Sequence, residues 1–263
     1  MAVSPALHER IGRKAILRAQ SFAYAMGFFY EILKETVNYL RQKRSRRVLT
    51  FQILFTGVEA LTVIAVLALA LGAIIIIQGV SLLPQFGQGS LIYTILITVI
   101  TRELGPILTA FIVTARSGTA IATELGNMVI NHEIEAYVAT GINPINYLVV
   151  PRFIGVTVSV VLLNLYFNIF GLLGSYFLTQ FVQAVGFVDY FSNLLGALSL
   201  VDVVSSLIKS VVFGAIISTV ATYYGFKVER SSTEVPQTTI KSVGQGFMLL
   251  IVANAILTLV YYI

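Results

Sequence analysis

Residues 60–101 form one long apolar stretch without a charged side chain, and this stretch limits what the chain can fold into. A helix of about 20 apolar residues crosses the hydrocarbon core of a bilayer, so the stretch is long enough for two crossings. GVSLLPQFGQG at 79–89 contains one Pro and three Gly, which predicts a turn between the two helices. The sequence therefore predicts an integral membrane protein.

Further apolar runs extend this interpretation to the rest of the chain. Hydrophobic residues make up 57% and charged residues only 11% of the 263 positions, and the mean hydropathy is +0.89. Soluble domains usually contain about 25% charged residues. The predicted fold class is an all-α integral membrane protein. Its five predicted transmembrane helices lie at about 52–77, 91–115, 153–179, 203–225 and 242–263.

The distribution of Lys and Arg predicts the orientation of these spans. The segments 78–90 and 180–202 contain no Lys or Arg, whereas 116–152, 226–241 and the N-terminal region do. Because basic residues concentrate in cytoplasmic loops, we expect a cytoplasmic N-terminus and a C-terminus on the outer side.

Ten of the 17 Lys and Arg residues fall before position 51, and they end in QKRSRR at 42–47. A basic cluster directly ahead of a membrane span suits anionic lipid on the cytoplasmic face. No RNA-binding signature accompanies it, so nucleic acid is not predicted as a partner.

The N-terminal region also contains an amphipathic pattern. Apolar residues recur at steps of three and four, while charged and polar residues fill the opposite side. This pattern predicts an interfacial helix on the inner leaflet; an ordinary helix packed on a soluble partner is the alternative. The predicted division is therefore a cytoplasmic region with this helix at 1–50 and a five-span domain at 51–263. The apolar positions are Phe22, Met26, Phe29, Leu33, Val37 and Leu40.

Two adjacent charges lie near the centre of the second predicted span. Placing a charge at mid-bilayer costs at least about 2.5–3.5 kcal/mol, so such a group normally faces protein or a wet cavity. Arg102 and Glu103 are neighbours and point about 100° apart around a helix. Either one of them faces a cavity or another subunit, or each has a structural partner, for example Glu103 with Lys209 of another span.

Three other charges have simpler explanations. Lys209 follows Asp202 by about 10 Å along a helix, so its stem could reach the outer interface. Glu59 could reach the headgroups at the cytoplasmic end of the first span, and Lys241 is a positive-inside anchor at the start of the fifth.

The segment 116–145 is long for a loop and predicts a helix of its own. Asn131 is its expected N-cap, and Gly141 and Pro144 are its expected end. The first turn contains Glu133 and Glu135, which are favourable near the positive end of the helix dipole. With the apolar Ile134, Tyr137 and Val138, this helix is either a docking surface for a soluble partner or a short helix packed under the bundle.

Catalytic motifs are absent from the sequence. There is no GxxxxGK[ST], GxGxxG, HExxH or GxSxG pattern, and the chain contains no Cys. We therefore predict no catalytic residue, no metal site and no ATP hydrolysis by the chain itself.

A resemblance becomes specific in ITRELGPILTAFIVTARSGTAIATELGNMVINHEIEAYVATGINPINYLVVPRFIG at 100–155. RELGP followed by ARSG, ELG-M, E-x-x-A, G-x-P and PR resembles the central signature of the MlaE/YrbE family of ABC-transporter permeases. FTGVEALTVIAVLALALGAIIIIQG at 55–79 and SLIKSVVFGAI at 206–216 also match, so the resemblance covers nearly the whole chain. KVERSSTEVPQ at 227–237 departs from the family's Gly-rich stretch.

The resemblance implies a permease subunit in the inner (cytoplasmic) membrane that moves phospholipid or related lipid between membranes. It implies a homodimer, a separate ABC ATPase subunit that binds the ATP, an MCE-domain protein on the outer side, and no cofactor in the chain itself. An ion-coupled secondary transporter or channel is the alternative, and a non-transporting scaffold is a third.

The same resemblance implies two groups of functional residues and a cytoplasmic coupling segment at 116–146 after the second span. The predicted lipid-binding residues are Arg102, Glu103, Lys209 and Lys241, and the resemblance implies that Arg102 and Glu103 line a lipid-accessible cavity at the dimer centre. The implied ATPase-coupling residues are Glu124, His132, Glu133, Ile134, Glu135 and Tyr137.

Overall fold

The computed structural model describes residues 7–41, 46–82, 91–182, 186–229 and 231–262, and it contains no strand within these ranges. Five of its helices are long and apolar enough to cross a membrane, which confirms the predicted all-α, five-span fold. These spans are Val48–Gly79, Leu91–Ile130, Ile145–Phe177, Leu200–Phe226 and Glu234–Tyr261.

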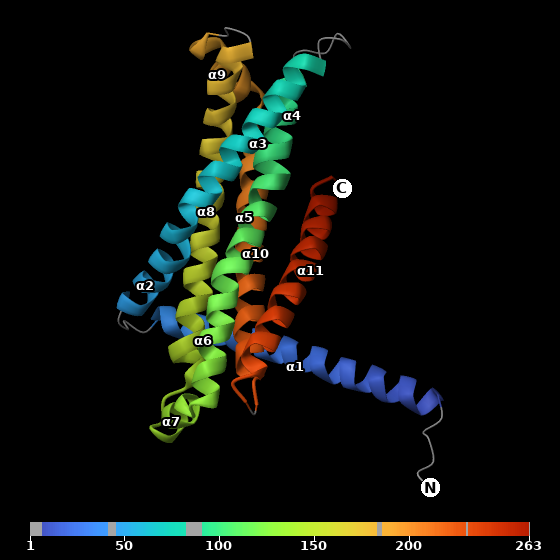
Figure 1. The fold of residues 1–263 in the computed structure, drawn as a ribbon, viewed down its shortest axis with the longest axis vertical. Coiled ribbons are helices and arrows are strands. Elements are labelled where there is room, and N and C mark those ends of the chain that lie inside the picture. The colour runs from blue at the N-terminus through green and yellow to red at the C-terminus, as the bar shows by residue number, and fades with distance from the viewer. Residues whose placement is uncertain (1–6, 42–45, 83–90, 183–185, 230, 263) are drawn as a thin grey trace.

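Three of the spans consist of several consecutive helical elements, and the other two are single helices (Figure 1). The first consists of α2 (Arg46–Gly57), η1 (Val58–Ala60) and α3 (Leu61–Leu82). The second consists of α4 (Leu91–Ile97), η3 (Thr98–Leu104), α5 (Gly105–Val113), η4 (Thr114–Gly118) and α6 (Thr119–Ile130). The remaining three are η5 (Ile145–Val149) with α8 (Val150–Val182), then α10 (Leu200–Phe226), then α11 (Glu234–Tyr262).

Helix α8 lies at the centre of the bundle, between α3 and α10, and glycines let the backbones approach closely. A Cβ atom added at Gly72 of α3 would overlap the carbonyl oxygen of Gly171, and one at Gly214 of α10 would lie 2.5 Å from the Cα of Thr157. Close approach at small residues is a main source of helix association in membranes, where burial of apolar surface gives little driving force.

The second span contains two turns of π-helix, η3 and η4. Such turns are rare and often occur at functional sites, because they change the direction in which the following side chains point. Arg102 and Glu103 both belong to η3, at the position where the sequence raised the question of their partners.

Helix α1 (Leu7–Arg41) crosses the foot of the bundle rather than joining it (Figure 1). It packs through Phe28 and Ile32, which bury against Val149 and Phe153. Of the predicted apolar stripe, Phe29 packs partly against this contact, whereas Met26, Leu33, Val37 and Leu40 are exposed; the side chain of Phe22 lies outside the described part of the structure. An exposed apolar stripe is what a leaflet would cover, but the membrane position of α1 stays a prediction.

The second span is longer than predicted, and the cap assigned to Asn131 is wrong. The span continues as α6 to Ile130, and Asn131 is the C-cap of that helix. His132 has a left-handed φ of 58° and precedes α7 (Glu133–Ala139), which has no side-chain cap at its N-terminus. The span can extend this far because its charged residues have partners: Arg116 pairs with Glu59, and Glu124 pairs with Arg152 of α8.

A short helix that the sequence did not predict, α9 (Phe187–Ala197), lies between the third and fourth spans, at the end of the bundle opposite α1 (Figure 1). Its Tyr190 is buried, and its hydroxyl lies 2.7 Å from the hydroxyl of Ser175. Burial raises the pKa of Tyr190 to about 12, so this phenol stays neutral at physiological pH.

Candidate functional site

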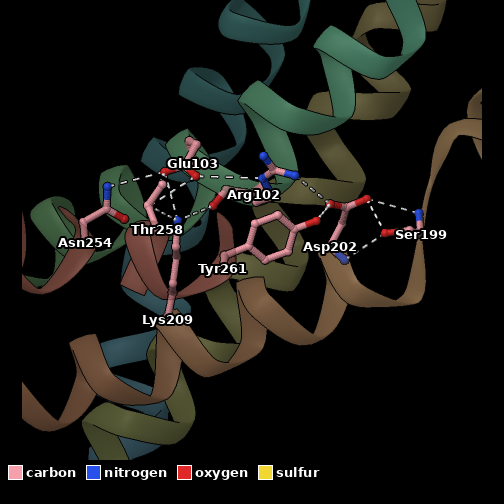
Figure 2. Close-up of polar contacts among 8 residues, drawn as sticks. All are labelled: Arg102, Glu103, Ser199, Asp202, Lys209, Asn254, Thr258 and Tyr261. Carbon is pink, nitrogen blue, oxygen red and sulfur yellow. Dashed lines mark hydrogen bonds and ion pairs between the residues drawn. The ribbon is translucent and has the colours of Figure 1, made fainter. Parts of the chain in front are cut away.

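Four charged side chains from the second and fourth spans meet inside the bundle (Figure 2). Arg102 and Glu103 come from η3, and Asp202 and Lys209 come from α10. Asn254, Thr258 and Tyr261 of α11 complete what we call the buried charge cluster.

Lys209 lies at the centre of this cluster and is 1% exposed. Its ammonium group donates to Glu103 Oε2, to the backbone oxygen of Arg102 and to Thr258 Oγ1, each at 2.9 Å. An ammonium group has three hydrogens to donate, and each of them has an acceptor here. The interpretation that Lys209 reaches the outer interface is therefore wrong.

Arg102 is held between a carboxylate and an aromatic ring. Its Nη1 atom lies 3.4 Å from Asp202 Oδ1, and its guanidinium carbon lies 4.2 Å from the centre of the Tyr261 ring. The Tyr261 hydroxyl in turn donates to Asp202 Oδ1 at 3.3 Å. The ring, the cation and the carboxylate therefore stabilise one another.

Asp202 is fixed in place by the start of its own helix. Ser199 is the N-cap of α10 and forms a capping box, in which Ser199 Oγ accepts from the Asp202 backbone at 3.2 Å. Asp202 Oδ2 accepts hydrogen bonds from the Ser199 backbone N–H at 3.1 Å and from the Ser199 hydroxyl at 2.7 Å. Oδ1 is then directed toward Arg102 and Tyr261.

Helix α11 reaches the cluster through one polar face. Thr258 Oγ1 donates to Glu103 Oε2 at 3.1 Å, and the Asn254 amide lies 3.5 Å from the same oxygen. The spacing of Asn254, Thr258 and Tyr261 places the three on one side of a helix. These three residues were not predicted from the sequence, although polar residues at this spacing in an apolar helix are a recognisable pattern.

Each charge of the cluster thus has a partner within the chain. The pairing of Glu103 with Lys209, which was one of the two alternatives, is present in the structure. Glu103 remains the most accessible of the four, with 28% of its side chain exposed. Removing one member of a buried ion pair usually costs about 3–5 kcal/mol, so the cluster holds the second, fourth and fifth spans together.

Lys241 does not belong to this cluster. It is exposed and lies near the start of α11, about 25 Å from Thr258 along the helix at about 1.5 Å per residue. The structure therefore separates it from the other three residues of the implied lipid site.

The implied coupling residues fall into two groups. Glu124 lies on α6, 2.7 Å from Arg152 Nη2, and is engaged within the bundle. The others belong to α7 or to the turn before it, where the exposed Glu135 lies 3.0 Å from Nδ1 of His132 and Glu133 is exposed. Ile134 and Tyr137 are partly buried against the core, whereas Val138 is 60% exposed. The exposed surface of α7 therefore carries the two carboxylates of Glu133 and Glu135 together with the apolar Val138.

Fold and site together define a multi-pass α-helical membrane protein in which charged side chains of the spans pair with one another inside the bundle. Residues 49–260 match the family model described as Permease MlaE, and the chain belongs to this family of ABC-transporter permeases. The family resemblance of the sequence is thereby confirmed.

Several relatives cover most of the chain. A probable ABC transporter permease protein of Rickettsia typhi is 31% identical over 79% of this chain and 80% of its own length. The intermembrane phospholipid transport system permease protein MlaE of Haemophilus influenzae is 24% identical over 78% of this chain and 79% of its own. The chloroplastic protein TRIGALACTOSYLDIACYLGLYCEROL 1 of Arabidopsis thaliana is 29% identical over 79% of this chain and 59% of its own.

Proposed function

We propose that this chain is the membrane-spanning subunit of an ABC transporter that moves phospholipid or a related lipid between membranes. The name of the Haemophilus influenzae relative, an intermembrane phospholipid transport permease, supports the substrate class. The absence of a phosphate-binding loop from the sequence means that a separate ATPase subunit supplies the energy. An MCE-domain protein on the outer side is the further partner of this proposal.

The buried charge cluster is the observation that carries the proposal. Arg102 presents a guanidinium group inside the bundle, and guanidinium recognises phosphate through paired hydrogen bonds. In the structure this guanidinium group is already in contact with the Asp202 carboxylate and the Tyr261 ring. We propose that this is a closed state, and that a headgroup phosphate takes the place of the Tyr261 ring on Arg102 when α11 moves away.

Helix α11 is suited to such a movement because little of it is buried. Only 11% of the most apolar 18 residues of its span are buried, and its exposed face carries large apolar residues such as Met248, Ile256 and Leu259. An apolar face of this kind needs lipid or another protein against it. We propose that a second copy of the chain covers it, so that two clusters face one lipid cavity at the centre of a homodimer.

The proposed orientation places α1 and α7 on the cytoplasmic side and the end of α11 on the outer side of the inner membrane. The acidic exposed surface of α7 is then available to the ATPase, and α7 follows directly on the span that carries Arg102. A movement of the ATPase against α7 can therefore be passed along α6 and α5 toward the cluster.

Purification of the protein from its native membrane tests these assignments. The expected result is co-elution with an ATPase, an apparent mass that corresponds to two copies of the chain, and phospholipid retained in the sample as measured by mass spectrometry. Ion flux through vesicles that contain the chain alone, without ATPase or bound lipid, would instead support the ion-coupled alternative.

A further inference from the structure

A hollow region lies at the foot of the bundle, between α1 and the end of α10. It consists of two pockets, of about 470 and 360 Å³, which share Lys227 and Glu229 in their walls. Volumes of 300–1,000 Å³ are typical of sites for small ligands. We call the two pockets together the α1–α10 cleft.

The two halves of the cleft differ in chemistry. The larger half is walled by aromatic rings, with the ring of Tyr223 6.0 Å from those of Tyr24 and Phe28, and that of Phe226 6.3 Å from that of Phe28. The smaller half is polar, and Gln237 and Lys241 of α11 line it. A molecule that fits both halves must have an apolar end and a polar end.

The charges of the cleft make few contacts within the protein, and the Lys227 ammonium lies 5.6 Å from the centre of the Tyr223 ring. Among the described residues, the ammonium groups of Lys227 and Lys241 and the carboxylate of Glu229 have no ion-pair partner. Glu234, by contrast, accepts a hydrogen bond from the Glu229 backbone at 3.2 Å. The cleft thus contains two cations, Lys227 and Lys241, and two carboxylates, of which Glu234 is engaged with the backbone and Glu229 is not.

Two features distinguish this cleft from the buried charge cluster. Lys227 follows Lys209 on α10 by about 27 Å at 1.5 Å per residue, so the two sites lie at different depths. The cleft is also walled in part by α1, through Gln20, Tyr24 and Phe28, whereas no residue of α1 belongs to the buried charge cluster.

We propose that the α1–α10 cleft binds a zwitterionic glycerophospholipid of the leaflet on which α1 lies, with Lys227 and Lys241 on its phosphate and Glu229 on its ammonium group. The aromatic half receives the glycerol and the first part of the acyl chains. A headgroup that carries both charges matches this set, whereas an anionic headgroup leaves Glu229 without a partner. The inference rests on the proposed function and deepens it, because it names the headgroup class and the place where lipid meets the protein on that side.

Native mass spectrometry of the full-length protein with its ATPase, titrated in detergent with palmitoyl-oleoyl phosphatidylethanolamine, tests the site. We expect Lys227→Gln and Glu229→Gln each to weaken one binding step per chain about tenfold, which corresponds to about 1.4 kcal/mol. Both residues are exposed, so folding is preserved. Lys34→Gln, on the exposed side of α1 and outside the cleft, is the matched control and leaves every binding step unchanged.

Two further ligands separate the possible sources of binding. Palmitoyl-oleoyl phosphatidylglycerol, which lacks the ammonium group, is expected to bind at this step at least fivefold more weakly. The free headgroup glycerophosphoethanolamine is expected not to compete, because it lacks the chains that the aromatic half receives. Equal binding of the two lipids, full competition by the free headgroup, or unchanged binding in both cleft variants would each overturn the proposal.

The same titration in an Arg102→Lys background keeps the two sites apart. If the cleft step persists while ATP-driven lipid transfer is normal in that background, the cleft proposal stands and the role of Arg102 fails. If the step is absent from the wild type while Arg102→Lys lowers transfer, the cleft proposal fails and the proposed function stands.

Discussion

The ammonium group of Lys209 lies 2.9 Å from the carboxylate of Glu103, and the two residues join the fourth span to the second within the bundle. Lys209 is 1% exposed, and it also donates to Thr258 of the fifth span. One side chain therefore connects three spans, which makes it the residue whose removal should affect the structure of the bundle most.

Replacing Lys209 with Met should destabilise the protein by about 3–5 kcal/mol, because Glu103 is left without its cation. Thermal unfolding of the purified protein in detergent measures the loss. The double change Lys209→Met with Glu103→Gln should recover part of it, since no unpaired charge remains. Equal stability of the wild type and the single variant would mean that the pair contributes nothing.

Replacing Gly72 with Leu should separate α3 from α8. The new side chain has no space beside the Gly171 carbonyl, and overpacking of this kind costs about 1–3 kcal/mol or more. Gly27→Leu on α1 is the control, because nothing lies within 4 Å of a Cβ at that position. A lower unfolding temperature for Gly72→Leu alone is expected, and equal values for both would contradict the close approach.

Single cysteines test the orientation, since the native chain has none. A cysteine at Ser192 of α9 should react with a membrane-impermeant maleimide applied to intact cells, and one at Asn131 should react only after the membrane is opened. Both positions are exposed in the structure. The reverse pattern would place the N-terminus on the outer side.

Changing Glu133 and Glu135 to Lys should weaken recruitment of the ATPase, because both carboxylates belong to the exposed surface of α7. Val138→Ser should weaken it as well, whereas Glu31→Lys on α1 should not. Pull-down of the ATPase with membranes that contain each variant gives the measurement. Undiminished recruitment by the α7 variants would assign the contact to another part of the protein.

The sequence was sufficient for the spans but not for their partners. Apolar length alone predicts the five crossings, since the hydrocarbon thickness fixes how many residues each needs. It could not show that Lys209 turns inward, because that depends on acceptors contributed by η3 and α11, which are distant in the chain.

Two helix ends were predicted incompletely from the sequence. Asn131 has the properties of an N-cap, yet it ends α6, because Arg116 of η4 and Glu124 of α6 are paired with Glu59 and Arg152 and do not end the span. The S-x-x-D spacing of Ser199 and Asp202 was a visible capping signal that could have placed Asp202 at the first turn of α10.

ATP-driven transfer of fluorescent phospholipid from vesicles that contain the permease and its ATPase tests the central proposal most directly. Arg102→Ala should lower the rate of lipid transfer at least tenfold without reducing ATPase recruitment. Arg102→Lys keeps the charge but loses the paired hydrogen bonds, so its transfer rate should lie between those of Arg102→Ala and the wild type. Transfer at the wild-type rate by both variants, in a correctly assembled complex, would contradict a role for Arg102 in lipid movement.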